Sequence, residues 1–101
     1  MANYTWYNIN RDTIFERIRQ GTQDFVRHNR PSPNDEFNVG LRLEYTWCGR
    51  PLVSWNCWHY CAHELTNRFY SEVTWDKSHL SHTLDRLFLQ FYYIDPTACE
   101  E

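Results

Sequence analysis

The 101-residue sequence is poor in glycine and proline and lacks any long apolar run. With three glycines, four prolines and 42% hydrophobic residues, it is not a low-complexity disordered chain. Because no stretch of about 18 apolar residues occurs, we expect no membrane-spanning segment and no membrane partner. The first ten residues lack the basic and apolar regions of a secretory signal, so we expect an intracellular, cytoplasmic protein.

Lysine is nearly absent, and acidic residues outnumber basic ones. One lysine and nine arginines face 13 acidic residues, for a formal net charge of -3. This balance excludes the strongly basic surface that is typical of nucleic-acid binding. Residues 1–30 are the exception, since they hold five arginines and three acids. A polyanion, if bound, is therefore expected at this first segment.

Aromatic residues are the abundant class, with five Trp, seven Tyr and six Phe in a single short chain. The length predicts one domain over residues 1–101. A domain of this size buries only about 60–65% of its unfolded-chain surface. Several aromatic side chains are therefore expected at the surface.

Hydrophobic periodicity predicts a helix over residues 13–29 and a hairpin over residues 37–55. The helix shows apolar residues three and four apart, with Thr13 and Glu16 as a capping box and Pro31 behind its end. Strict alternation from Phe37 to Trp47 predicts a strand with one buried face, followed by a return strand.

The second half of the chain is less regular. Residues 56–75 fit either a helix or a continued strand, a turn and a third strand at 68–75, and we favour the strands. Residues 77–94 show a helical stripe, and residues 97–101 are expected to be a loose tail. The stripe consists of Leu80, Leu84, Leu87, Phe88, Phe91 and Ile94. The predicted fold is α+β in the order α-β-β-β-α, with α-β-β-α-α as the alternative. Two helices behind a small antiparallel sheet would leave one sheet face open, carrying Trp55, Cys57 and His59.

Cysteine and histidine alternate in one short segment, which raises the possibility of a zinc site. An intracellular chain keeps cysteines as thiols or metal ligands rather than disulfides. Zinc needs about four Cys or His ligands arranged as a tetrahedron. No CxxC pair occurs, so we expect no cofactor and keep zinc as an alternative, with the ligands Cys48, Cys57, Cys61 and His63.

The segment Asn56-Cys57-Trp58-His59-Tyr60, followed by His63-Glu64-Leu65, resembles the permuted papain-like thiol enzymes of the lecithin:retinol acyltransferase group. The resemblance implies Cys57 as a nucleophile at the start of a helix, whose dipole would favour the thiolate. Elsewhere the chain offers no catalytic serine arrangement, carboxylate pair or glycine-rich phosphate loop. We therefore expect a protein that is not an enzyme and keep the thiol enzyme as an alternative.

The predicted element order α-β-β-β-α resembles that of the double-stranded RNA-binding domain. This resemblance implies a first helix that faces a minor groove. The lysine-rich start of the last helix in that family is here Asp76-Lys77-Ser78-His79. RNA binding is therefore a second alternative, with the contacts Arg19, Gln23, Arg27 and Arg30.

Trp, Tyr and Arg, the types enriched in this chain, are also those enriched at the energetic centres of protein interfaces. The main prediction is a small module that binds another protein, including a second copy of itself. Short, motif-poor chains of this kind suit viral or phage accessory proteins that inhibit a factor in the cytoplasm of a host cell. The predicted binding residues are Trp47, Trp55, Trp58, His59, Tyr60, Tyr70 and Trp75.

Overall fold

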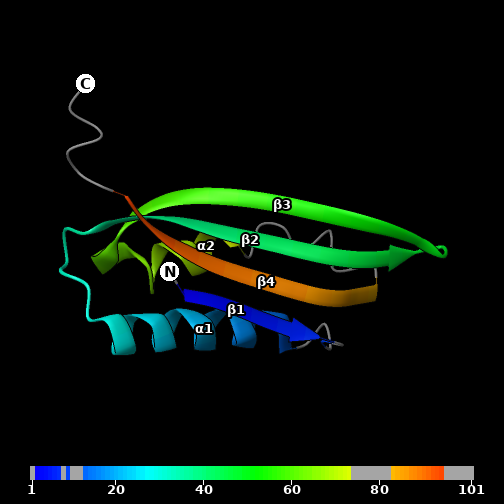
Figure 1. Ribbon diagram of the computed structural model, residues 1–101, viewed down its shortest axis with the longest axis horizontal. Coiled ribbons are helices and arrows are strands. Elements are labelled where there is room, and N and C mark those ends of the chain that lie inside the picture. Colours follow the sequence, from blue (N-terminus) through cyan, green and yellow to red (C-terminus); the bar gives the residue numbers. More distant parts are fainter. Residues whose placement is uncertain (1, 8, 10–12, 74–82, 95–101) are drawn as a thin grey trace, which may run out of the picture.

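The protein forms a four-stranded antiparallel sheet with both helices on one side, as a computed structural model shows for residues 2–7, 9, 13–73 and 83–94 (Figure 1). The strands lie in the order β1-β4-β2-β3. This arrangement confirms the predicted α+β class. The elements are β1 (Ala2–Tyr7), α1 (Ile14–Asn29), β2 (Glu36–Trp47), β3 (Arg50–Cys61), the 3-10 helix η2 (Ala62–Glu64), α2 (Arg68–Val73) and β4 (Thr83–Ile94).

The hairpin of β2 and β3 confirms the alternation seen in the sequence. Its turn is the pair Cys48-Gly49, with φ of 51° and 76°, which is the two-residue type I′ geometry that matches strand twist. Pairing continues without a break from Trp47 opposite Arg50 to Glu36 opposite Cys61. The favoured continuation of the second strand from Pro51 to Ala62 is therefore confirmed as far as Cys61, and Ala62 begins the 3-10 helix.

Helix α1 packs closely on the sheet because it carries glycine at the point of contact. A Cβ added at Gly21 would lie 2.9 Å from Leu89 Cδ2 and 2.9 Å from Trp6 Cη2. The helix ends at Asn29, directly before the left-handed C-cap Arg30 (φ 47°) and Pro31, which agrees with the predicted end. The expected capping box is not formed, because Thr13 makes no side-chain cap and Glu16 pairs with Arg19 instead.

Aromatic rings join the helices to one face of the sheet. The ring of Phe25 in α1 stacks on Phe91 at 4.4 Å and meets Phe37 edge-on at 5.1 Å between centroids. Phe69 in α2 contacts Trp58 and packs beside Tyr60. The strand residues that these helix rings contact all lie on one face of the sheet, so both helices cover the same side.

The predicted helix over residues 77–94 is wrong where the structure describes it, because residues 83–94 form β4. A bulge explains the misleading pattern: Tyr45 pairs with Leu84 and Glu44 with Arg86, which leaves Asp85 as an extra residue. Leu84 and Leu87 therefore both reach the core although they are three apart, which imitates a helical stripe. Residues 77–82 lie outside the described part.

The order α-β-β-β-α is consequently wrong for the described elements, and so is the final helix of the alternative order. The preferred third strand at residues 68–75 is also incorrect, since Arg68–Val73 is a helix that buries Phe69 and Val73. Strand β1 was not predicted, although Tyr4 and Trp6 alternate with polar residues. The predicted tail at 97–101 lies outside the described residues.

Candidate protein-binding surface

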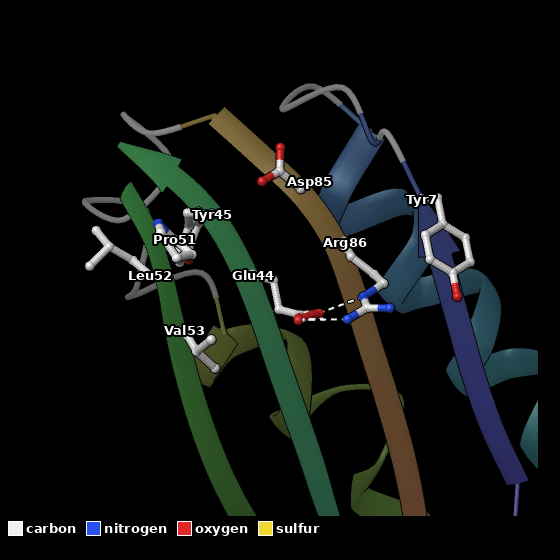
Figure 2. A pocket seen from close by; sticks show the side chains of 8 residues that line it. All are labelled: Tyr7, Glu44, Tyr45, Pro51, Leu52, Val53, Asp85 and Arg86. Carbon is white, nitrogen blue, oxygen red and sulfur yellow. Dashed lines mark hydrogen bonds and ion pairs between the residues drawn. The ribbon is translucent and has the colours of Figure 1, made fainter. Parts of the chain in front are cut away.

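The sheet has a second face that no described helix covers, and we call it the open face. It comprises the side chains that alternate with the core positions on all four strands. Trp55, Cys57 and His59 are exposed on it, as the sequence predicted for the uncovered side. Figure 2 looks onto this face, with the helices behind the sheet.

The outer edge of the Trp55 indole lies close over β2 on the open face because β2 has Gly40 at this point. A Cβ added at Gly40 would come within 2.6 Å of Cη2 and 3.1 Å of Cζ2 of the Trp55 indole. The indole remains 51% exposed in this position. Because Gly40 has no side chain, it leaves room for a large aromatic side chain that still faces solvent.

A depression of about 290 Å³ opens beside this indole, lined by Arg42, Trp55, Phe88 and Gln90. The guanidinium of Arg42 lies 5.6 Å from the centroid of the Phe88 ring, within cation–π distance. The hydroxyl of Tyr92 donates to the side-chain oxygen of Gln90, which orients that amide. The depression therefore combines two ring surfaces with a cation and an amide.

A second depression of about 310 Å³ lies toward the hairpin end and is shown in Figure 2. Glu44 and Arg86 form a bidentate ion pair in it, with Arg86 Nη2 donating over 2.7 Å. Arg86 also lies 4.6 Å from the Phe88 centroid and 5.5 Å from that of Tyr7. The hydrogen bonds from Arg86 lower the pKa of Glu44, and those to Glu44 and Tyr7 raise the pKa of Arg86.

The predicted protein-binding residues divide between the two sides of the sheet. Trp55 and His59 lie on the open face, where His59 Nε2 is 3.3 Å from Glu36 Oε1. Trp47 is 53% exposed, but it belongs to the helix side of β2, at the end of the strand next to the hairpin turn. Trp58 is half-buried against Phe69, and Tyr60 is in the core. Tyr70 is half-buried at α2, and Trp75 lies outside the described residues.

Tyr60 and Tyr70 are both packed on the helix side of the sheet. Tyr60 donates to Glu72 Oε2 over 2.7 Å, and burial is the main reason why its pKa is raised. Burial also raises the pKa of Tyr70 to about 12. Both phenols therefore contribute to the packing of α2 against the rest of the protein.

The four alternative zinc ligands are spread over three elements. Cys48 is in the hairpin turn, and Cys57 and Cys61 are four residues apart on β3, which corresponds to about 13 Å. His63 Nδ1 lies 2.9 Å from the carbonyl oxygen of Pro33. Within the described ranges, no three His, Cys, Asp or Glu side chains are grouped so that they could hold a metal ion.

Cys57 is in the middle of a strand and not at the start of a helix. The helix dipole that the resemblance to thiol enzymes implied is therefore not available to this cysteine. The basic residues proposed for RNA lie on α1, where Arg19 pairs with Glu16 and Arg27 with Asp24. Gln23 is exposed on the same helix, and Arg30 is its C-cap.

Sequence reasoning missed much of the open face. The predicted binding residues do not include Arg42, Phe88 or Gln90. For Phe88 and Gln90 the reason is the helical stripe of residues 77–94, which places Phe88 in the core. The available signal was the alternation of Leu87, Leu89 and Phe91 with Arg86, Phe88 and Gln90, which follows from a strand over the same residues.

Comparison with models of protein families, with curated proteins and with solved structures finds no match for this chain. None of the helices that the structure describes is long and apolar enough to cross a membrane.

Proposed function

We propose that this protein is a binding module without catalytic activity that captures another protein on its open face. The observation that carries the proposal is the depression between Trp55 and Phe88, which sits at the centre of an uncovered sheet face. Trp and Arg are over-represented among residues that dominate binding energy, and such residues cluster in central pockets. A protruding apolar or aromatic side chain of the partner would fill this depression, with Arg42 and Gln90 at its border.

Charge favours a protein over a nucleic acid on this face. Arg86 is held by Glu44, and Arg42 Nη2 lies 3.6 Å from the same carboxylate. A phosphate backbone would have to compete with this acid for both guanidinium groups, whereas phosphate contacts usually come from uncompensated cations. Two of the three arginines proposed for RNA, Arg19 and Arg27, are likewise paired with acids at three-residue spacing.

The test is capture and affinity measured with matched variants. We expect the tagged protein to retain a partner from extracts of its native host, and Arg42→Ala and Phe88→Ala to weaken the purified pair. A central interface residue contributes about 2 kcal/mol or more, which corresponds to roughly a 30-fold rise in Kd. The partner recovered would also show whether the target is the host factor expected for a viral or phage accessory protein.

Two tryptophans of the hairpin provide the internal control. Trp55 and Trp47 are 51% and 53% exposed, but only Trp55 lies on the open face. We expect Trp55→Ala to weaken binding strongly and Trp47→Ala to leave Kd within about twofold, since exposed residues outside an interface core contribute little. Equal losses in the two variants, or salt-sensitive binding to RNA that Arg19→Glu and Arg27→Glu abolish, would overturn the proposal.

A further inference from the structure

Strand β3 is one edge of the sheet, and it is the longer edge. It has 12 residues, whereas β1 at the other edge has six. No described strand pairs with the outer side of β3. An edge strand presents a row of backbone donors and acceptors, and proteins usually shield such rows with lysine, proline, bulges or short length.

The register of the hairpin identifies which backbone groups point outward. In a two-residue turn the closing pair, Trp47 and Arg50, exchanges hydrogen bonds, and the ladder then alternates along the strands. Odd-numbered residues of β3 therefore direct their N–H and C=O groups away from β2. Two observations agree with this parity: Pro51, which has no N–H, is odd-numbered, and the N–H of Cys61 donates to Glu64 Oε2 over 3.4 Å.

The outward row consists of Val53, Trp55, Cys57 and His59, which spans about 20 Å. The usual protections are missing here: β3 has no lysine, no acidic residue and no register shift against β2, and its one proline stands at the second position. Apolar side chains flank the row on both faces. Leu52 on the helix side is 39% exposed, and Val53 on the open face is 56% exposed.

We propose that β3 pairs antiparallel with β3 of a second copy of this chain, which joins two sheets into one of eight strands. Antiparallel pairing of identical strands satisfies a two-fold axis, in which the same patch serves both subunits. Charge also suits this partner, because residues 51–58 carry no formal charge and meet their copies without repulsion. Such pairing covers the exposed side chains of Leu52 and Val53 with residues of the second copy's β3 and places the two open faces side by side.

The experiment uses charges of chosen sign on the outward row. Wild-type protein is expected to show twice 12.4 kDa by light scattering, and the variant with Val53→Lys and Cys57→Lys only 12.4 kDa. A variant with Val53→Glu and Cys57→Glu should also be monomeric, and mixing it with the lysine variant should restore the doubled mass. Val53→Thr with Cys57→Ser is the neutral control that keeps the dimer, and circular dichroism reports folding of each variant.

Hydrogen exchange identifies the edge itself. In the dimer, the amides of Val53, Trp55, Cys57 and His59 should exchange more slowly than in the lysine variant, while amides within β2 are unchanged. A wild-type protein of 12.4 kDa up to millimolar concentration, as expected if the edge serves a peptide from another protein, would overturn the proposal. A dimer that the lysine variant keeps would overturn it as well.

This inference is independent of the proposed partner site, because it depends on the backbone edge and not on the depression. Arg42→Ala should lose partner capture and keep the doubled mass, whereas the lysine variant should lose the doubled mass. Failure of either proposal is therefore distinguishable from failure of the other.

Discussion

Strand β4 can be tested by two neighbouring substitutions that a helix and a strand would rank in opposite order. In the helical stripe predicted from the sequence, Phe88 is a core residue and Leu89 is outside the stripe. In the sheet, Leu89 is fully buried and stands in register between Tyr4 and Leu41. Phe88 is partly exposed on the open face. Leu89→Ala and Phe88→Ala therefore report directly on the conformation of this segment.

The expected magnitudes follow from burial. Truncating a buried leucine to alanine costs about 2–5 kcal/mol, and the upper part of that range applies when neighbours cannot close the cavity. Leu89 packs where α1 approaches the sheet most closely, next to Gly21, so collapse is restricted. Phe88 loses mainly cation–π contacts, worth about 0.5–1 kcal/mol each at exposed sites. Against a total stability of about 5–15 kcal/mol, only the leucine change is severe.

The assay is urea unfolding followed by circular dichroism, with tryptophan fluorescence as a second probe. We expect the midpoint of Leu89→Ala to fall well below that of Phe88→Ala, with unchanged slopes, since a constant slope means that stability alone has changed. A thermal scan should show the same order, at about 4–8 °C for each kcal/mol in a domain of this size. A larger loss for Phe88→Ala than for Leu89→Ala would refute the placement of β4.

Three further changes test the site and the side chains around it. Gly40→Ala should displace the indole of Trp55, which alters its fluorescence and weakens partner binding. The unfolding midpoint should stay close to that of the wild type. An unchanged Trp55 fluorescence would contradict the contact. Folding stability should fall as the pH rises from about 10, the ordinary tyrosine value, through about 12, the raised pKa of Tyr70, because the folded state favours the neutral phenol. Thermal scans of Tyr70→Phe should show a smaller alkaline loss, and an identical loss would contradict this assignment. Cys48 and Cys57 are both exposed, so alkylation followed by mass spectrometry should show similar rates for the two. The half-buried Cys61 should react more slowly. A Cys57 that reacts about a hundred times faster than Cys48 would instead support the thiol enzyme.

Local patterns identified correctly those elements whose faces differ in polarity. Strand β2 buries Phe37, Val39, Leu41, Leu43 and Tyr45 between polar neighbours, so its period of two was visible in the sequence. Helix α1 was equally clear, since its apolar stripe ends before Pro31. Strand β4 was not, because it lies between β1 and β2 and carries large side chains on both faces. A bulge at Asp85 then displaced its inward residues by one position.

The sequence by itself determined that the aromatic residues exceed what a core of this size needs, and that Trp55, Cys57 and His59 would share an uncovered face. Which further residues join them depended on strand order. Register brings Arg42 of β2, Trp55 of β3 and Phe88 of β4 onto one level of the sheet, although 46 positions separate Arg42 from Phe88. Cross-strand neighbours of this kind are set by long-range backbone pairing, and local periodicity contains no information about it. The tertiary structure alone therefore decided the composition of the site and left β3 at the edge.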